Sequence, residues 1–244
     1  MINQRKVLAV VPARGGSKGI PLKNLRQIRG RALVSLAGDA ASQIPEIDRR
    51  VVSTDHPKIA CVAREAGLDV PFMRPETLAG DRVSDWDVLT HALLETEKCD
   101  GLRYDIVVML QPTSPLRRPE DVSRAIVMLV TGGFDAVWTV SETDSKGHPM
   151  KQLALRNGYL DYWDSRGAQI IARQQLDTVY HRNGVAYVFT RDCLLEQRTI
   201  LGNRTGAYIV AGESISIDTE RDIADVEFAL DRGDANLPKI SSGT

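Results

Sequence analysis

Short apolar runs alternate with longer amphipathic segments through the first 140 residues, and this alternation restricts the fold more than any other feature of the sequence. The apolar runs predict strands at residues 7–11, 50–53, 70–72, 105–110 and 136–140. The segments between them predict helices at residues 32–42, 57–66, 85–97 and 119–130. Because strands that alternate with helices form βαβ units, we expect an α/β fold with a mostly parallel sheet.

The regular pattern is interrupted at about residues 143–180. Asn157 and Gly158 stand there between two apolar-containing runs, which predicts a β-hairpin. We therefore expect one domain over residues 1–234, with an insertion at 143–180 that projects from the sheet as a dimer contact or a substrate lid. Residues 235–244 are predicted to form a flexible tail.

Composition and cysteine spacing exclude several classes of protein. A formal net charge of −1 with 26% charged residues gives no support for nucleic-acid or membrane-surface binding. Cys61, Cys99 and Cys193 are widely spaced and have no C-x-x-C pattern, so they predict neither a disulfide framework nor a zinc site. The N-terminal prolines and glycines argue against a transit peptide, and the apolar run there is too short for a signal sequence or a membrane span. We expect a cytoplasmic protein.

The stretch AVVPARGGSKGIPLKN, residues 9–24, joins an apolar run to a glycine-rich loop with three cations, Arg14, Lys18 and Lys23. No Asp or Glu precedes Asp39, so the positive charge is local. The loop has neither the residue order of a P-loop nor the G-x-G-x-x-G of a Rossmann fingerprint. Glycines let backbone N–H groups approach a ligand, and open α/β sheets bind ligands at the carboxyl ends of their strands. We interpret the stretch as a phosphate-binding loop; the alternative is a solvated surface loop.

Six segments form an ordered set of motifs along the chain. They are PARGGSKGIPLKN (12–24), STD (53–55), RPETLAGDRVS (74–84), LQPTSPLR (110–117), RNGVAYVF (182–189) and SISIDTERD (214–222). Together they resemble the signature of the acylneuraminate cytidylyltransferases, the CMP-sialic acid synthetase family, over nearly the whole chain. The resemblance implies a Rossmann-like nucleotide-binding sheet of the nucleotide-diphospho-sugar transferase type, and a homodimer.

The resemblance also implies which residues hold the nucleotide, with the opening loop on the phosphates of CTP. The nucleotide-binding residues carried over are Arg14, Ser17, Lys18, Lys23, Asn24, Arg74, Ser84 and Gln111. The implied phosphate role of the loop agrees with its charge, because Arg makes bidentate contacts to phosphate and Lys acts as a point charge. The amide of Gln111 can read a pyrimidine edge; alternatively, it satisfies backbone groups beside Pro112.

The sugar substrate is assigned by the same resemblance to Gln111, Arg173 and Tyr187. Arg173 stands near the position where the family uses a basic residue for the sugar carboxylate, and a planar guanidinium suits a carboxylate. Arg173 and Tyr187 could instead be residues of a dimer interface.

The metal motif departs from the family pattern of Asp-x-Asp before the Thr, because this chain has Ser216, Ile217 and Asp218 there. Mg²⁺ is usually held by one or two carboxylates with water and substrate phosphates. We therefore expect Mg²⁺ on Asp218, with Ser216 as a weak neutral ligand at most. Either one carboxylate is sufficient, or another acid such as Asp222 or Glu213 compensates, or activity is weakened. Alternatively, Asp218 only ends a strand before a capped helix.

The resulting prediction is a nucleotidyltransferase that uses CTP and a nonulosonic acid, such as sialic, legionaminic or pseudaminic acid, and releases pyrophosphate. Arg14, Lys23 and Asp218 with its Mg²⁺ are the predicted catalytic residues, because the chemistry depends on positioning and charge neutralisation. The alternatives are a GT-A-like glycosyltransferase and a non-catalytic nucleotide or sugar-acid binding protein.

Overall fold

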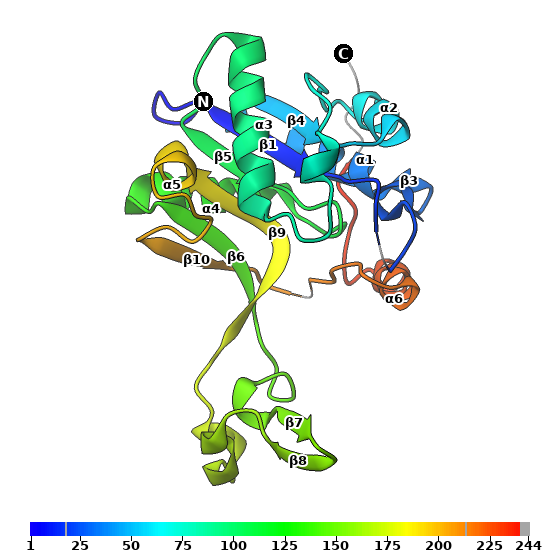
Figure 1. Cartoon of the computed structure of the whole chain (residues 1–244). Helices are drawn as coiled ribbons and strands as arrows, with labels where there is room; N and C mark the ends of the chain where they lie inside the picture. Colours follow the sequence, from blue (N-terminus) through cyan, green and yellow to red (C-terminus); the bar gives the residue numbers. More distant parts are fainter. Residues whose placement is uncertain (18, 213, 240–244) are drawn as a thin grey trace.

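A six-stranded sheet forms the centre of the protein, whose computed structural model describes residues 1–17, 19–212 and 214–239. From one edge to the other, its strands are β10 (Thr205–Ile209), β6 (Ala136–Glu142), β9 (Tyr180–Thr190), β5 (Ile106–Met109), β1 (Val7–Pro12) and β4 (Arg49–Ser53) (Figure 1). All neighbouring strands run parallel except at β9, which is antiparallel to both β5 and β6. The predicted α/β fold with a mostly parallel sheet is confirmed.

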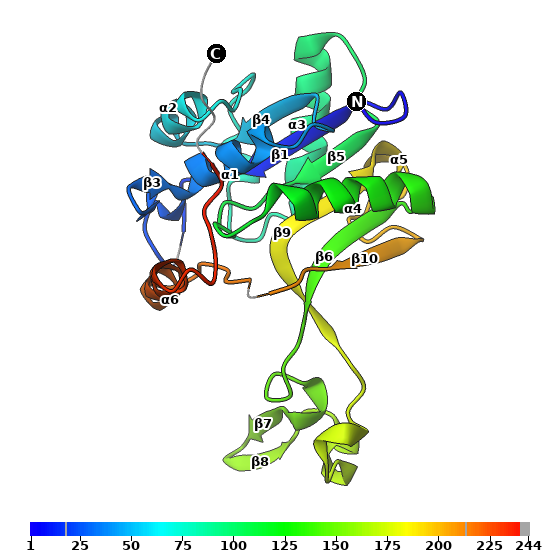
Figure 2. The same ribbon diagram turned by 180° about the vertical axis from the view of Figure 1, so that it is seen from behind.

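Helices cover both faces of the sheet. One face carries α3 (Asp85–Asp100) and α5 (Arg191–Leu195), and the other carries α1 (Leu33–Ser42), α2 (Pro57–Glu65) and α4 (Pro119–Gly132) (Figures 1 and 2). Strand β1 serves both layers, because alternate side chains of a strand point to opposite faces. Val7, Ala9 and Val11 pack into the α1, α2 and α4 layer, whereas Leu8 and Val10 pack into the α3 and α5 layer.

The sequence predictions of secondary structure agree with the structure to within three residues, with one exception. The strand predicted at residues 70–72 is wrong, because only the preceding residue, Asp69, forms an isolated bridge to Val51. Pro71 has no N–H group to donate to a ladder, which explains why pairing stops there.

Residues 143–179 form an arm that projects away from the sheet between β6 and β9 (Figures 1 and 2). Its hairpin consists of β7 (Leu153–Arg156) and β8 (Tyr159–Tyr162), with Asn157 and Gly158 at the turn. Both turn residues have positive φ, 51° and 85°, which is the conformation of a two-residue hairpin turn. The predicted hairpin is confirmed. Short 3₁₀ helices at Pro149–Lys151, Ser165–Gln169 and Arg173–Gln175 complete the arm.

The C-terminal segment closes over the opening loop. Helix α6 (Glu220–Asp231) begins with a capping box between Thr219 and Asp222, and its Ile223 and Val226 pack against Ile20 of the loop. The same region contains the short ladder of β2 (Gln27–Ile28) and β3 (Arg31–Ala32) and, at their N-terminal side, the 3₁₀ helix Lys23–Leu25.

Residues 235–239 follow α6 and return to the body of the protein. Leu237 packs against the apolar cluster beneath α6, and the side-chain amide of Gln43 donates to the carbonyl of Lys239 at 3.0 Å. Flexibility of the tail stays a prediction, and residues 240–244 lie outside the described part. None of the helices in the described ranges combines the length and the apolar character needed to span a membrane.

Candidate nucleotide-binding pocket

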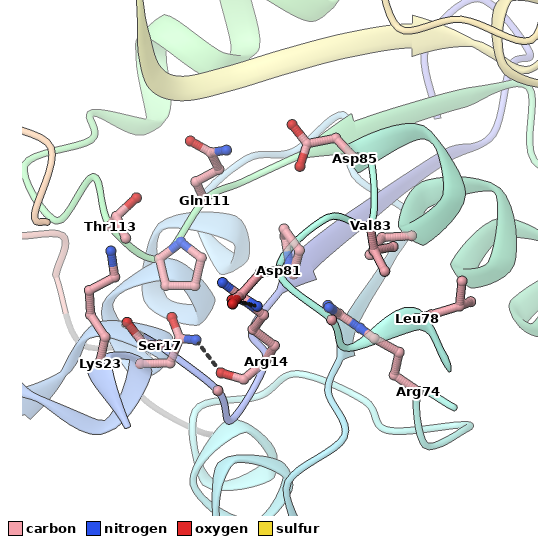
Figure 3. Close-up of a pocket in the computed structure, with 16 residues that line it drawn as sticks. Arg14, Ser17, Lys23, Arg74, Leu78, Asp81, Val83, Asp85, Gln111 and Thr113 are labelled. Atoms are coloured by element: carbon pink, nitrogen blue, oxygen red, sulfur yellow. Dashed lines mark hydrogen bonds and ion pairs between the residues drawn. The ribbon is translucent and has the colours of Figure 1, made fainter. Parts of the chain in front are cut away.

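A pocket of about 280 Å³ opens where β1 and β5 end (Figure 3). Three segments line it: the opening loop after β1, residues 74–88 between β4 and the first turns of α3, and residues 111–113 after β5. Its position agrees with the expectation that an open α/β sheet binds its ligand at the carboxyl ends of its strands.

The opening loop is fixed to the neighbouring strand end by its backbone. The N–H of Ala13 donates to the carbonyl of Ser53 at 2.9 Å, and the N–H of Gly15 donates to the carboxylate of Asp55 at 2.8 Å. A side chain at residue 15 would lie only 2.9 Å from the ring of His56, so glycine is required for this approach. Asn24 closes the loop by donating its side-chain amide to the carbonyl of Arg14 at 2.9 Å.

Two cations of the loop reach carboxylates that come from distant segments. Nη1 of Arg14 donates to Asp81 at 2.7 Å, and Nζ of Lys23 donates to Asp218 at 2.8 Å and to the carbonyl of Ile217 at 2.9 Å. Figure 3 shows the side chains of Arg14 and Asp81 in direct contact within the pocket. Because both cations remain partly exposed, a phosphate can compete with the carboxylates for them.

A third cation, Arg74, belongs to the buried part of the site. Its side chain is 6% exposed and donates to the hydroxyl of Ser53 at 3.0 Å and to the carbonyl of the same residue at 2.6 Å. Burial lowers the pKa of Arg74 to about 10, while the carboxylate of Asp55 opposes this shift. The guanidinium therefore stays charged at neutral pH and adds positive potential to the pocket.

Gln111 is positioned by Gly184, which lies on β9. Gly184 has a φ of 72°, and a Cβ there would lie 2.7 Å from Oε1 of Gln111 and 2.6 Å from the hydroxyl of Ser114. Arg117, which is fully buried, supports this contact by donating to the carbonyls of Gln111 at 2.6 Å and Gly184 at 3.1 Å. The LQPTSPLR and RNG motifs thus form one packed unit, and the conformation of each depends on the other.

A bulge in β9 makes this approach possible. Trp138 of β6 is opposite Tyr187, but Val140 is opposite Arg182, so residues 183–186 of β9 stand opposite a single residue of β6, Thr139. The hydroxyl of Thr139 donates to the side chain of Asn183 at 2.7 Å and accepts the N–H of Ala186 at 2.9 Å. Bulges of this kind re-aim side chains beside functional sites.

Most of the residues predicted for the nucleotide lie together in the pocket. They are Arg14, Ser17, Lys23, Asn24, Arg74 and Gln111. Ser84 is instead the N-cap of α3, where its hydroxyl accepts the N–H of Asp87 at 3.2 Å. Lys18 lies outside the described residues.

The residues predicted for the sugar do not gather in the same way. Tyr187 is 1% exposed, and its hydroxyl accepts the N–H of Gly184 at 2.9 Å, so it supports the bulge from within the core. Arg173 is exposed on the arm, outside the residues that line the pocket. Only Gln111 of the three predicted sugar-binding residues lines the pocket within this chain.

The acidic residues near the C-terminal motif offer few ligands for a metal. Asp218 is largely exposed and pairs with Lys23, whereas Asp222 accepts the N–H groups of Asp218 at 2.8 Å and Thr219 at 2.7 Å. These N–H groups hold the pKa of the Asp222 carboxyl below its usual value. Ser216 is exposed, and Glu213 lies outside the described residues. Within the described ranges, no three His, Cys, Asp or Glu side chains cluster as a metal site.

Several residues at the pocket escaped the sequence interpretation. Asp81 and Asp85 line it, and Arg182 adjoins it through an ion pair with Asp85 at 3.3 Å. All three stand in or next to motifs that were identified. A charged residue beside a glycine was the available signal, since Asp81 follows Gly80 and Arg182 precedes Asn183 and Gly184. The contacts of these residues, however, are made with segments far away in the chain.

The family of the protein follows from comparison with known sequences. A family model described as cytidylyltransferase matches residues 8–232. The chain belongs to this family. It is therefore a nucleotidyltransferase, and the cytidylyltransferase assignment agrees with a pocket that presents cations at the ends of parallel strands.

Curated relatives of this cytidylyltransferase extend the comparison. It is 32% identical to the CMP-N,N'-diacetyllegionaminic acid synthase of Legionella pneumophila over 229 residues, which cover 93% of this chain and 97% of that protein. It is 29% identical to an N-acylneuraminate cytidylyltransferase of Streptococcus agalactiae, with 91% of this chain aligned to 52% of that longer protein.

A solved structure shows the same fold. The CMP:2-keto-3-deoxy-manno-octonic acid synthetase, solved in complex with CTP, superposes with a TM-score of 0.67 at 20% identity, over 93% of this chain and 99% of that one. At this identity the similarity establishes the fold of the cytidylyltransferase and nothing further.

Proposed function

We propose that this cytidylyltransferase transfers CMP from CTP to the anomeric hydroxyl of a nonulosonic acid and releases pyrophosphate. One observation carries the proposal: a single pocket at the strand ends joins the cations of the opening loop to Gln111. The relatives named for legionaminic and acylneuraminic acids support the substrate class.

The reaction is a displacement at the α-phosphorus of CTP. The anomeric oxygen forms a bond to this phosphorus, the bond to the bridging oxygen of pyrophosphate breaks, and the hydroxyl proton is lost. Arg14 and Lys23 lie where they can neutralise charge on the phosphates once these replace Asp81 and Asp218 as their partners. Gln111, fixed by Gly184 and Arg117, supplies an amide that can select the pyrimidine or orient the sugar.

We propose that the reaction also uses Mg²⁺, and the donor set fits such an ion in a limited way. Asp218 is 75% exposed and reaches the pocket through its contact with Lys23, whereas the carboxylate of Asp222 is already occupied by the N–H groups of Asp218 and Thr219. A single protein carboxylate suits Mg²⁺ that is held mainly by nucleotide phosphates and water. A bound Mg²⁺ supplies charge neutralisation to the triphosphate, in addition to that from Arg14 and Lys23.

We also propose that two copies of the chain associate through the arm. In the β7–β8 hairpin, Leu153 is opposite Tyr162 and Leu155 is opposite Leu160. Opposed residues of an antiparallel pair project to the same side, so these four form one apolar hairpin face. Leu155 and Leu160 are 71% and 69% exposed, which is unusual for paired leucines on a folded hairpin and indicates an interaction surface. Arg173 stays a prediction for the sugar carboxylate, and from the arm it would have to act in a second copy.

The proposal is tested by measuring pyrophosphate release from CTP with a panel of nonulosonic acids, and from ATP, GTP and UTP with each acid. We expect turnover with CTP and at least one acid, and at least tenfold lower kcat/KM with the other nucleotides. Equal turnover with UTP would contradict the assignment of CTP.

Ser216 in the metal motif was the reason for the alternative of a non-catalytic binding protein, which the cytidylyltransferase family of the chain argues against. That alternative predicts that CTP binds but that no panel acid yields pyrophosphate at any Mg²⁺ concentration. The cytidylyltransferase match over residues 8–232 favours CMP transfer over the glycosyltransferase alternative.

A further inference from the structure

Arg182 is the residue of β9 directly before the bulge, and its guanidinium packs against two aromatic rings. Its guanidinium carbon is 4.8 Å from the ring centroid of Trp138 and 4.9 Å from that of Tyr187. The two rings pack edge to face with centroids 5.4 Å apart. Cation–π contacts of this kind hold a guanidinium in place without using its hydrogen-bond donors. The described donor contacts of Arg182 go to Asp85 and to the side chain of Tyr187, and neither is the two-oxygen contact that a guanidinium can make with a bound carboxylate.

The ion partner of Arg182 is weakly held. Nη2 of Arg182 donates to Oδ2 of Asp85 at 3.3 Å, which is long for a charged pair. The side chains are 45% and 36% exposed, respectively, and such exposed pairs contribute little free energy. Asp85 lines the pocket, so an anion bound there can replace its carboxylate at small cost.

The other described cations at the pocket have different positions. Arg14 and Lys23 belong to the opening loop, and the buried Arg74 is committed to Ser53. Figure 3 shows Gln111 and Asp85 on the side of the pocket nearest β9, with Ser17 and Lys23 on the side of the opening loop. Arg117 also lies on the β9 side, but it is buried and donates to the carbonyls of Gln111, Gly184 and Val185. Arg182 is therefore the described cation on that side that is partly exposed.

We propose that Arg182 binds the carboxylate of the sugar acid, exchanging Asp85 for the substrate. This inference rests on the proposed function, because a nonulosonic acid carries its carboxylate on the anomeric carbon, next to the reacting hydroxyl. A planar guanidinium can contact both oxygens of that carboxylate, which the single long contact to Asp85 does not exploit. Trp138 and Tyr187 hold the guanidinium against their rings, and Arg182 directly precedes the bulge at residues 183–186.

The first test compares Arg182→Met with the wild-type protein, using the panel acid of highest kcat/KM. Methionine preserves an unbranched apolar side chain against the two rings but removes the charge. We expect KM for the acid to rise roughly 10- to 100-fold, as for the loss of a charged hydrogen-bonded contact, with KM for CTP changed less than threefold. Arg182→Lys keeps the charge and is expected to recover part of the loss.

The second test asks whether the effect concerns the carboxylate itself. The C1 carboxamide of the same acid is tested as a competitive inhibitor against the acid, and its inhibition constant is compared with the dissociation constant of the acid. The wild-type protein is expected to bind the acid at least tenfold more tightly than the carboxamide, and Arg182→Met is expected to bind the two with affinities within threefold. Retained discrimination in Arg182→Met would overturn the proposal, because the carboxylate would then be recognised elsewhere.

Two control variants separate the alternatives. Arg191→Met removes an arginine at the start of α5, directly after β9, that is paired with Glu97, and it is expected to leave both KM values unchanged. Arg173→Met tests recognition from the arm: loss of carboxylate discrimination there, but not in Arg182→Met, would overturn our assignment.

Two outcomes separate the role of Arg182 from the proposed function. Absence of turnover with every acid in the wild-type protein would contradict the proposed function. Normal turnover with an unaltered KM for the acid in Arg182→Met would contradict only the role of Arg182.

Discussion

Gly184 at the pocket and Gly158 at the tip of the arm have similar backbone conformations, with φ values of 72° and 85°, but very different surroundings. A Cβ on Gly184 would meet Gln111 and Ser114 at less than 3 Å, whereas a Cβ on Gly158 would have no atom within 4 Å. The glycine in the pocket is required by contact between distant segments, and the glycine in the arm only by its turn. The pocket is therefore determined by packing within the chain, while the arm presents the apolar hairpin face outward.

The largest effect on activity is expected from removing a charge at the pocket rather than one on the arm. Lys23→Met is expected to lower kcat/KM for CTP by roughly 100- to 1000-fold, because it removes a charge that acts on the phosphates. Steady-state kinetics of pyrophosphate release checks this. Arg26→Met is the matched control, since Arg26 pairs with Glu220 nearby but does not line the pocket. A similar loss in both variants would mean that Lys23 acts by holding the C-terminal segment.

Alanine substitutions at Gly184 and at Gly158 give a direct comparison of the pocket with the arm. Gly184→Ala is expected to lower the free energy of unfolding by about 2 to 4 kcal/mol, from a strained φ and from overpacking against Gln111 and Ser114. It is also expected to lower kcat/KM at least tenfold. Gly158→Ala adds only the backbone strain, so we expect a loss of about 1 to 2 kcal/mol confined to the hairpin, with unchanged turnover. Urea unfolding and kinetics of both variants check the difference; equal effects would show that packing at the pocket is not what distinguishes them.

The smallest effect on stability is expected at the arm. The double variant Leu155→Ser and Leu160→Ser removes two exposed side chains, so its free energy of unfolding at low protein concentration should stay within about 0.5 kcal/mol of wild type. Its mass by light scattering should fall to that of one chain if the apolar hairpin face joins two copies. Phe228→Ser, on the exposed side of α6, is the control that should leave the mass unchanged. A dimeric double variant would place the contact elsewhere.

Local patterns in the sequence predicted most of the fold because they depend on neighbouring residues. The buried run of β1, the capping box of Thr219 and Asp222, and the turn at Asn157 and Gly158 are each specified within a few positions. The pocket was predicted in part for the same reason, since its opening loop carries its own glycines and cations.

The remaining features depend on contacts between distant segments. Ser84 belongs to a motif associated with the nucleotide, yet its hydroxyl caps α3, and no local pattern separates the two roles. Tyr187 and Arg182 acquire their positions from the β9 bulge, which depends on Thr139, more than 40 residues earlier in the chain. The order of residues alone does not reveal such a bulge.

The contact between Lys23 and Asp218 also has a consequence for synthesis of the protein. The two residues are 195 positions apart, so the opening loop lacks this partner until 195 further residues have been made. At translation rates of 5 to 20 residues per second, that interval is roughly 10 to 40 seconds. During this time Ile20 and Ile28 have no α6 to cover them, because Ile223 and Val226 have not yet been made. The apolar side chains beneath the opening loop of a nascent chain are thus uncovered until α6 leaves the ribosome.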